Sequence, residues 1–201
     1  WPAAEAAYRA ALTRPNPGTA AMRLHLTLIN AGQARPAEDF ARAWLKAHPG
    51  DVDLRFQLGD VAHLQGAWAV AEDHYRAVLA KRADHALAMN NLADTLLRQR
   101  KPGALALAEQ AVKRLPQDPR TLDTLATALA AERQFDRALV LQKQALATSG
   151  NQPPYRLNLA RLLIQAGDKA GARSQLAQLT ELGESFVGQP EVARLLAATA
   201  P

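Results

Sequence analysis

Apolar residues recur along this chain every three or four positions, in short segments that end at Pro, Gly or Asp. This spacing matches the 3.6-residue turn of an amphipathic α-helix, which buries one face. The stretches "HPGD" (48–51) and "LPQD" (115–118) close two such segments, and a new apolar pattern begins directly after each. The pattern therefore predicts a series of short helices joined by tight turns, with no β-strand.

The residues at the junctions predict where helices stop and start. Pro116 cannot continue a helix, whereas Asp118 can cap the next one with Pro119 in its first turn. Similar caps are predicted at the other junctions, from Asp51, Asp84 and Asn151.

The stops recur about every 34 residues, which is the period of a helix–turn–helix repeat. Counting from the start of each repeat, the seventh position is Leu24, Leu58, Leu92, Leu125 and Leu159. The eighth position is small in most repeats, with Gly59, Ala93, Ala126 and Ala160. The twentieth position is always Ala, at Ala37, Ala71, Ala104, Ala138 and Ala172, once the third repeat is aligned as one residue short in its turn at 100–103.

These positions make the sequence resemble the tetratricopeptide (TPR) repeat family. The resemblance implies an all-α fold, a right-handed TPR superhelix or α-solenoid of antiparallel helix pairs. Small residues at the eighth and twentieth positions let the two helices of a pair approach closely. A single pair cannot bury its apolar face, so neighbouring repeats are expected to share one continuous core.

The repeat pattern divides the chain into three parts. Residues 1–17 match only the second helix of a truncated repeat, and residues 183–201 are expected to form a loop and a C-terminal capping helix. Between them, residues 18–182 hold five repeats, at 18–51, 52–85, 86–118, 119–152 and 153–182. We therefore expect a fragment of a longer array, with possible self-association through the exposed face of the truncated N-terminal helix.

Composition supports closely packed helices, because 48% of residues are hydrophobic and only 5% are aromatic. The net charge of +5 comes from 24 basic and 19 acidic residues spread along the chain. This dispersion favours solvated helix faces over a nucleic-acid surface. No apolar run approaches the roughly 20 residues of a membrane span.

Nothing in the sequence has the spacing of a catalytic, cofactor or metal site. There is no Cys, and the five His residues show no metal-ligand spacing. Phosphate-binding, zinc-protease and nucleophile-elbow motifs are also absent from the sequence. The sequence therefore predicts a protein that is not an enzyme and uses no cofactor.

The TPR resemblance implies instead a concave groove lined by the first helix of each repeat, with a protein or peptide as its partner. The amides of Asn91 and Asn158 could bond to the backbone of an extended peptide. The family's clamp for a C-terminal carboxylate needs cations where this chain has acids, so a basic ligand is expected. The side chains of Asn91 and Asp94 are expected to face solvent in the free protein. The candidates are Asp60, His63, Asn90, Asn91, Asp94, Arg120, Asp123, Thr127, Asn158 and Arg161.

Some large residues stand apart from the repeat pattern. Trp1, Trp68 and Phe135 share one position and are expected to wedge between helices. Trp44 and His25 replace the smaller residues of the other repeats. Two interpretations stay open for this pair: a locally widened helix interface, or a binding anchor.

From Ala86 onward, including "NNLADTLLRQRKPGALALAEQAVKRLPQDP" and "YRLNLARLLIQAGDKAGARSQLAQL", the chain also resembles the C-terminal repeats of TPR lipoproteins of the PEP-CTERM/exosortase system. This resemblance implies an extracytoplasmic array, anchored through an upstream lipid site and linked to exopolysaccharide production and surface-protein sorting. The alternative is a substrate-presenting segment of a larger enzyme, such as a glycosyltransferase or sulfotransferase.

Overall fold

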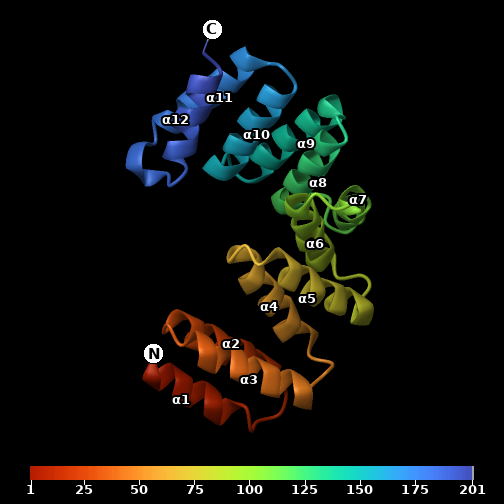
Figure 1. The fold of residues 1–201 in the computed structure, drawn as a ribbon, viewed down its shortest axis with the longest axis vertical. Coiled ribbons are helices and arrows are strands. Elements are labelled where there is room, and N and C mark those ends of the chain that lie inside the picture. Colours follow the sequence, from red (N-terminus) through yellow and green to blue (C-terminus); the bar gives the residue numbers. More distant parts are fainter. Residues whose placement is uncertain (201) are drawn as a thin grey trace. The chain divides into compact units, whose positions relative to one another are not determined.

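The structure of the chain is a computed structural model that describes residues 1–200. Only helices occur as regular secondary structure in this range (Figure 1). The chain divides into two compact units, Trp1–Ala88 and Met89–Pro201, and each is described by itself.

The N-terminal unit contains α1 (Pro2–Ala11), α2 (Gly18–Asn30), α3 (Ala34–Ala47), α4 (Val52–Leu64) and α5 (Trp68–Lys81). Helix α6 (Ala86–Gln99) begins at the end of this unit. The C-terminal unit continues with α7 (Ala104–Arg114), α8 (Pro119–Ala131), α9 (Phe135–Thr148), α10 (Pro153–Gln165), α11 (Lys169–Thr180), the short 3-10 helix η1 (Gly183–Ser185) and α12 (Gln189–Ala198).

Two of the predicted helix caps are confirmed. The Leu54 N–H donates to Asp51 Oδ1 over 2.9 Å at the start of α4. At the start of α8, the Arg120 N–H donates to Asp118 Oδ1 over the same 2.9 Å. Both carboxylates therefore satisfy a backbone donor that has no partner within its own helix.

The other two predicted caps are wrong. At the start of α6 the acceptor is His85 Nδ1, which lies 3.1 Å from the Ala88 nitrogen, and not Asp84. Asn151 instead ends α9 in a left-handed conformation (φ 62°), and its N–H donates to the Leu146 carbonyl over 2.9 Å. Asn tolerates this conformation better than most residues, so it serves here as a helix stop rather than a helix start.

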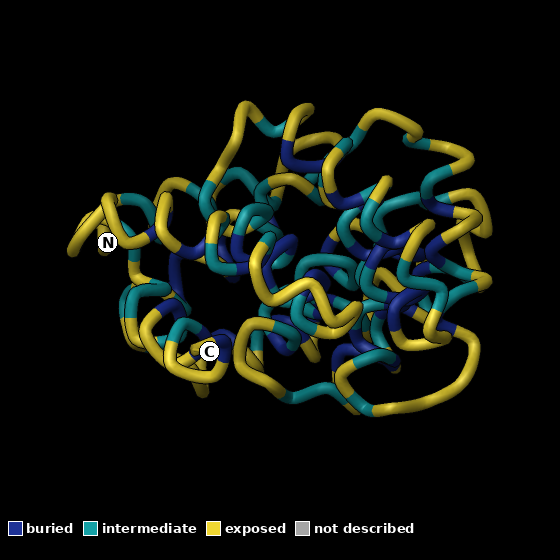
Figure 2. The backbone as a smooth tube through the Cα atoms, turned by 90° about the horizontal axis from the view of Figure 1, so that it is seen from above, coloured by how far each residue is buried: buried dark blue, intermediate teal, exposed yellow. Residues whose placement is uncertain are grey.

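In the N-terminal unit, α2 packs against α1, α3 and α4. Leu24, Leu28 and Ala37 are fully buried in one cluster, and Trp44 packs in a second cluster with Ala21 and Leu54. In Figure 2 such buried positions alternate with exposed ones along the tube, as expected for amphipathic helices.

The two residues that depart from the repeat pattern both make internal contacts. The Trp44 indole Nε1–H donates to Asp51 Oδ2 over 2.7 Å and its ring stacks on His48. His25 is 2% exposed, its Nδ1 lies 2.8 Å from Gln57 Nε2, and burial lowers its pKa. This geometry favours the widened helix interface over a binding anchor.

The wedge residues behave differently from one another. Phe135 packs against the core of the C-terminal unit, and the Trp68 ring lies edge-on to His63 with ring centroids 4.9 Å apart. Trp1 is 62% exposed, so the prediction that it wedges between helices is wrong. It precedes α1, a helix in which no residue is fully buried.

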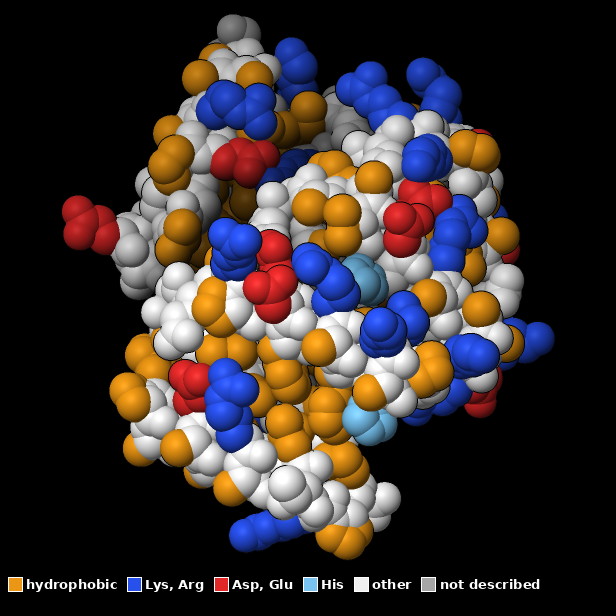
Figure 3. Space-filling model, turned by 60° about the horizontal axis from the view of Figure 1, so that its bottom comes forward, with side chains coloured by type: hydrophobic (Ala, Val, Ile, Leu, Met, Phe, Trp, Pro, Cys, Tyr) orange, Lys and Arg blue, Asp and Glu red, His pale blue; other side chains and the backbone are white. Residues whose placement is uncertain are grey.

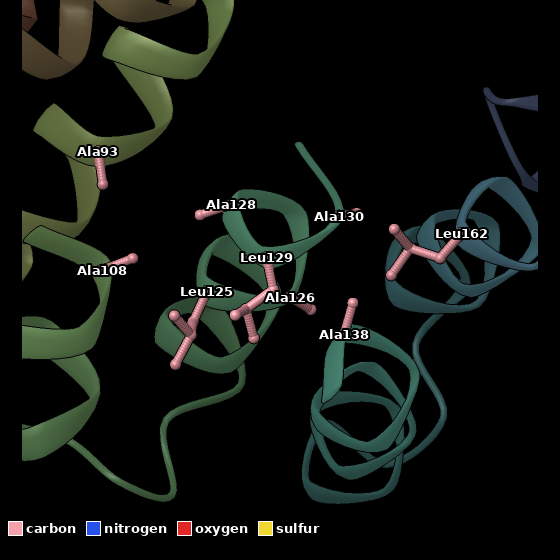
Figure 4. Close-up of a cluster of buried hydrophobic side chains, with 9 residues drawn as sticks. All are labelled: Ala93, Ala108, Leu125, Ala126, Ala128, Leu129, Ala130, Ala138 and Leu162. Carbon is pink, nitrogen blue, oxygen red and sulfur yellow. The ribbon is translucent and has the colours of Figure 1, made fainter. Parts of the chain in front are cut away.

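In the C-terminal unit, α8 lies between two layers of small side chains. Figure 4 shows Leu125 and Ala128 on the side of α8 facing Ala93 and Ala108. Ala126 and Ala130 lie on the other side, nearer the Ala138 of α9 and the Leu162 of α10. Because these contacts are mostly Ala and Leu, the helices pack closely and their positions are tightly constrained.

Candidate functional site

A hollow of about 500 Å³ opens in the C-terminal unit between α6, α8, α10 and α12. Three of these are first helices of the predicted repeats, and α12 is the helix that follows the last pair. The lining is mixed, with charged, amide, hydroxyl and apolar side chains: Asp94, Leu97, Arg98, Asp123, Thr127, Ala131, Asn158, Arg161, Leu162, Gln165 and Glu191.

Asp123 of α8 is the central acceptor of this site. The Gln142 Nε2 of α9 donates to Asp123 Oδ1 over 2.6 Å and to the Tyr155 carbonyl over 3.0 Å. The Asn158 Nδ2 of α10 donates to both oxygens of the same carboxylate, over 2.8 and 2.9 Å. One carboxylate thus connects three helices through side-chain hydrogen bonds.

The network continues from α10 to α12 through Arg161. Its guanidinium donates to Asn158 Oδ1 and makes a bidentate pair with Glu191, with Nε–Oε1 of 3.0 Å and Nη2–Oε2 of 2.6 Å. Bidentate pairing of this kind holds the guanidinium in one orientation. Arg161 and Glu191 are 40% and 31% exposed, so a ligand in the hollow can reach both.

Burial and charge move two pKa values in opposite directions. Removal from water raises the pKa of Asp123, although the amide donors of Asn158 and Gln142 partly oppose this effect. Hydrogen bonding from Arg161 lowers the pKa of Glu191. At neutral pH the Arg161 end of the hollow therefore carries a compensated ion pair.

The α6 side of the hollow combines an ion pair with apolar surface. Arg98 Nε lies 3.4 Å from Asp94 Oδ1, one turn away on the same helix. Leu97 and Ala131 add apolar contacts, and the exposed Gln165 carries an amide that can both donate and accept. Such a lining can contact both the backbone and the side chains of a polypeptide.

The structure brings some of the predicted groove residues together and separates others. Asp94, Asp123, Thr127, Asn158 and Arg161 all line the hollow. Asp123 and Asn158 also bond to each other and to neighbouring helices, because both are engaged in the network. The Thr127 hydroxyl likewise donates to the Asp123 carbonyl over 3.0 Å.

Three further candidates of the C-terminal unit lie outside this lining. Asn90 is 5% exposed, and its Nδ2 donates to Asn91 Oδ1 over 3.0 Å. Arg120 points back to the cap of its own helix, where its Nη2 donates to Asp118 Oδ2 over 2.6 Å. Local hydrogen bonds hold these side chains outside the lining of the hollow, and their contact with a peptide stays a prediction.

The last two candidates belong to the N-terminal unit. Asp60 Oδ1 accepts a hydrogen bond from the Tyr75 hydroxyl over 2.8 Å. His63 packs against Trp68. Asp60 lines a separate hollow of its own unit, together with apolar residues of α2 and α4.

Sequence reasoning missed Gln142, Arg98 and Glu191. Gln142 is 0% exposed although it lies in the middle of α9, where the sequence suggests an ordinary polar position. Glu191 lies in the first turn of α12, where an acidic residue is expected for the helix dipole alone. No local signal distinguishes either residue, since the partners of both lie on other helices.

The charged face in Figure 3 and the described residues bear on three other classes of site: a nucleic-acid surface, a metal site and a membrane span. On the face shown in Figure 3, basic side chains are dispersed and acidic ones lie among them. Across the part of the chain that the structure describes, no group of three or more His, Asp or Glu is placed to hold a metal ion. No helix within residues 1–200 is long and apolar enough to cross a membrane.

Comparison with known families finds matches along most of the chain. Two models described as "Tetratricopeptide repeat" match it, one at residues 26–83 and 65–119, the other at residues 129–199. The comparison with curated proteins finds no match.

Several solved structures are similar to the chain at low sequence identity. A thermophilic TPR protein from Thermus thermophilus has a TM-score of 0.72 at 20% identity, covering 90% of this chain and 99% of that one. PilW, titled a widely conserved type IV pilus biogenesis factor, has a TM-score of 0.77 at 19% identity, covering 92% and 88%. YrrB, titled a TPR protein with an unusual peptide-binding site, has a TM-score of 0.65 at 16% identity, covering 88% and 92%. The predicted all-α solenoid fold is confirmed by these likenesses.

Proposed function

Because the chain belongs to the tetratricopeptide repeat family, we propose that it is a non-enzymatic scaffold that holds a polypeptide in the hollow of its C-terminal unit. The observation that carries this proposal is the mixed lining contributed by α6, α8, α10 and α12. A polypeptide segment presents backbone amides, apolar groups and charges together, and this lining has a counterpart for each. YrrB, a protein of similar fold, is titled for its peptide-binding site.

The hydrogen bonds divide the lining into supporting and contacting groups. The Asn158 amide donates to Asp123 and accepts from Arg161, so its role is to position Arg161 rather than to hold the ligand backbone. The contacting groups are then Arg161, the exposed Gln165 amide and the apolar side chain of Leu97. A rigid support of this kind lowers the entropy lost on binding.

Site-specific photocrosslinking tests the proposal. A photoreactive amino acid placed at Gln165, which lines the hollow, should capture a polypeptide in cells that express the full chain. The matched control is the same group at Val140, which is 66% exposed on α9 and does not line the hollow. Equal capture at both positions would contradict the assignment of the site.

We also propose that this scaffold acts in exopolysaccharide production or PEP-CTERM surface-protein sorting, in an extracytoplasmic array anchored to the membrane. The support is the resemblance of the residues from Ala86 onward to TPR lipoproteins of that system. Sequencing the complete gene tests the context. A lipid-bearing Cys upstream is expected, whereas a catalytic domain in the same polypeptide would favour the alternative of an enzyme-linked array.

Self-association through α1 is a further part of the proposal. Ala3, Ala6, Ala7 and Ala10 are all exposed and share one helix face, and Trp1 beside them is 62% exposed. Sedimentation velocity should show concentration-dependent association that Ala6→Lys abolishes. The same substitution at the exposed Ala106 of α7 should leave it unchanged, and a monomer at every concentration would rule the contact out.

A further inference from the structure

A further hollow, of about 490 Å³, lies in the N-terminal unit between α3, α4 and α5, and we call it the α3 hollow. Helices α3 and α5 are the second helices of the first two predicted repeats, so it lies apart from the groove that first helices are expected to line. None of the groove candidates belongs to its lining. That lining consists of Glu38, Ala41, Arg42, Leu45, Lys46, Arg55, Leu58 and His74.

The floor of the α3 hollow is apolar. The five lining residues of α3 stand at the first, fourth, fifth, eighth and ninth positions of 38–46, which form one face of a helix. Ala41 is 4% exposed, and the half-buried Leu45 and Leu58 pack against the core of the unit. The remaining surface of the two leucines is open to a further apolar contact.

The rim of the α3 hollow carries an excess of positive charge. Its cations are Arg42, Lys46 and Arg55, and its acid is Glu38. Arg42 already pairs with Asp39, with Nη1 and Oδ1 3.4 Å apart. Among the residues that the structure describes, neither Lys46 nor Arg55 has an ion-pair partner. Two cations are therefore left for a partner to neutralise.

The pKa of His74 reflects the same excess of positive charge. Burial lowers the pKa of the His74 ring and the neighbouring Arg55 charge lowers it further, although Asp73 acts in the opposite direction. The ring is therefore uncharged at neutral pH, and Lys46 and Arg55 determine how the α3 hollow attracts an anion.

The C-terminal unit carries a segment of complementary chemistry, the 181–187 loop between α11 and α12. Its sequence, ELGESFV, contains two acids and no base. Glu181 and Glu184 are exposed, and within residues 1–200 neither carboxylate has an ion-pair partner. Leu182 is 39% exposed and Val187 is 95% exposed, so the loop also presents apolar surface.

Contacts within its own unit hold the 181–187 loop in place. Phe186 packs against the core formed by α10, α11 and α12, whereas its neighbour Val187 is exposed. Directly after the loop, the Gln189 Nε2 donates to the Leu179 carbonyl over 2.6 Å, which ties the two ends together. A loop that is held in this way loses little conformational entropy when it docks.

We propose that the 181–187 loop of one copy docks in the α3 hollow of a second copy. Val187 would cover the apolar floor. The two carboxylates of the loop would meet the ammonium of Lys46 and the guanidinium of Arg55. Every copy carries both surfaces, so the contact is heterologous and can add copies one after another. The inference goes beyond the proposed scaffold function, because it uses neither the hollow of the C-terminal unit nor α1.

Crosslinking between two single-cysteine chains tests the geometry, since the chain has no Cys of its own. An affinity-tagged chain carries Val187→Cys, and an untagged chain carries Arg42→Cys on the rim of the α3 hollow. A short bismaleimide should join the two chains. The matched control is Val140→Cys in the tagged chain, because Val140 is 66% exposed on α9. Equal yields from Val187→Cys and Val140→Cys would overturn the inference.

Charge reversal tests the ionic part in chains that also carry Ala6→Lys, which removes the contact through α1. One chain carries Glu181→Lys with Glu184→Lys, and the other carries Lys46→Glu with Arg55→Glu. Sedimentation velocity in low salt should show each reversed chain as a monomer. Their equimolar mixture should associate, because each reversed surface then meets a surface of opposite charge. A mixture that stays monomeric would contradict the proposal.

The matched control separates a specific contact from an effect of net charge. Glu132→Lys with Asp136→Lys changes the charge by the same amount at exposed positions of the α8–α9 turn, and should leave the association unchanged. In about 1 M NaCl, where the Debye length is about 3 Å, docking of the 181–187 loop should be lost. The apolar contact through α1 is therefore measured in that salt, where Ala6→Lys alone should abolish association.

Val187→Ser keeps every charge and changes a residue that is 95% exposed, so it tests the contact with little risk to the fold. It should weaken the low-salt association, and circular dichroism should show all variants folded. Unchanged association of Val187→Ser, or its loss in the Glu132→Lys, Asp136→Lys control, would count against the docking. None of these results affects the photocrosslinking at Gln165, so failure of this inference and failure of the scaffold site remain distinguishable.

Discussion

Replacing Gly59 by Ala should destabilise the N-terminal unit, although Ala is the better helix former. The new Cβ would lie 2.6, 2.9 and 3.0 Å from three atoms of the Tyr75 ring. Tyr75 is 0% exposed, so its ring cannot withdraw without disturbing the packing around it. The substitution therefore sets helix propensity directly against steric conflict.

The magnitude follows from three contributions. Overpacking of a close contact costs about 1–3 kcal/mol. Displacing the ring also weakens the 2.8 Å hydrogen bond from the Tyr75 hydroxyl to Asp60, worth about 1.5 kcal/mol for a charged acceptor at a partly exposed site. The higher helix propensity of Ala returns about 1 kcal/mol. We expect a net loss of about 1.5–3.5 kcal/mol in the free energy of unfolding.

Urea denaturation followed by tryptophan fluorescence measures this loss in the right part of the chain. The three tryptophans are Trp1, Trp44 and Trp68, and all belong to the N-terminal unit. Gly50→Ala is the matched control, because a Cβ at Gly50 meets nothing within 4 Å. This control should stay within about 0.5 kcal/mol of the parent.

A second background identifies the cause. In a Tyr75→Leu chain the ring is gone, so Gly59→Ala should be neutral or should stabilise by up to about 1 kcal/mol. The reasoning is refuted if Gly59→Ala is as stable as the parent in the original background. It also fails if the loss is the same in both backgrounds, because Tyr75 would then not be its source.

Three further predictions concern the C-terminal unit. Burial raises the native pKa of Asp123, so the stability that protonation of this group gives the parent is fully present below the ordinary carboxyl pKa of about 4 and is lost as pH rises through the native pKa. In urea denaturation, the stability of Asp123→Asn relative to the parent should therefore increase as pH rises above about 4. A hydrogen bond from Arg161 lowers the pKa of Glu191, so Glu191→Gln should reduce the stability of α12 by at most about 1 kcal/mol at neutral pH. This loss should disappear as pH falls through the native pKa of Glu191, and hydrogen exchange of the α12 amides measures it. Ala126 is 0% exposed, so Ala126→Leu should lower the free energy of unfolding by about 1–3 kcal/mol, whereas Ala106→Leu at an exposed position should leave it unchanged. Equal melting temperatures of Ala126→Leu and the parent would contradict the repeat register.

Much of the fold could be read from the sequence because its signals are local. Asp51 and Asp118 cap helices by accepting from a residue two or three positions further on, and any sequence pattern shows such a pair directly. The Ala of the twentieth repeat position is buried in every repeat, from Ala37 at 0% exposed to Ala104 at 5%. A helix repeats its faces every three or four residues, so spacing alone indicates which residues are buried.

Local sequence signals were misleading where a helix could start or stop at either of two neighbouring residues. Asp84 and His85 are adjacent and both can cap, but only the His85 ring accepts from the α6 backbone. Asn151 suits both a helix start and a left-handed helix stop, and the chain uses it as a stop. Residue type narrows such a choice, but the path of the backbone into the next helix decides it.

The sequence by itself determined the helices, their repeat and the face that each one buries, because these depend on contacts within a few residues. Only the tertiary structure decided what the polar groups do. Gln142 reaches Asp123 across 19 residues, Arg161 reaches Glu191 across 30, and Asn158 reaches Asp123 across 35. Hydrogen bonds between helices depend on the distance and rotation at which the helices pack. The apolar contacts of the core together determine both. A polar side chain that the sequence pattern places in solvent therefore forms a hydrogen bond only where packing brings a suitable partner within about 3 Å.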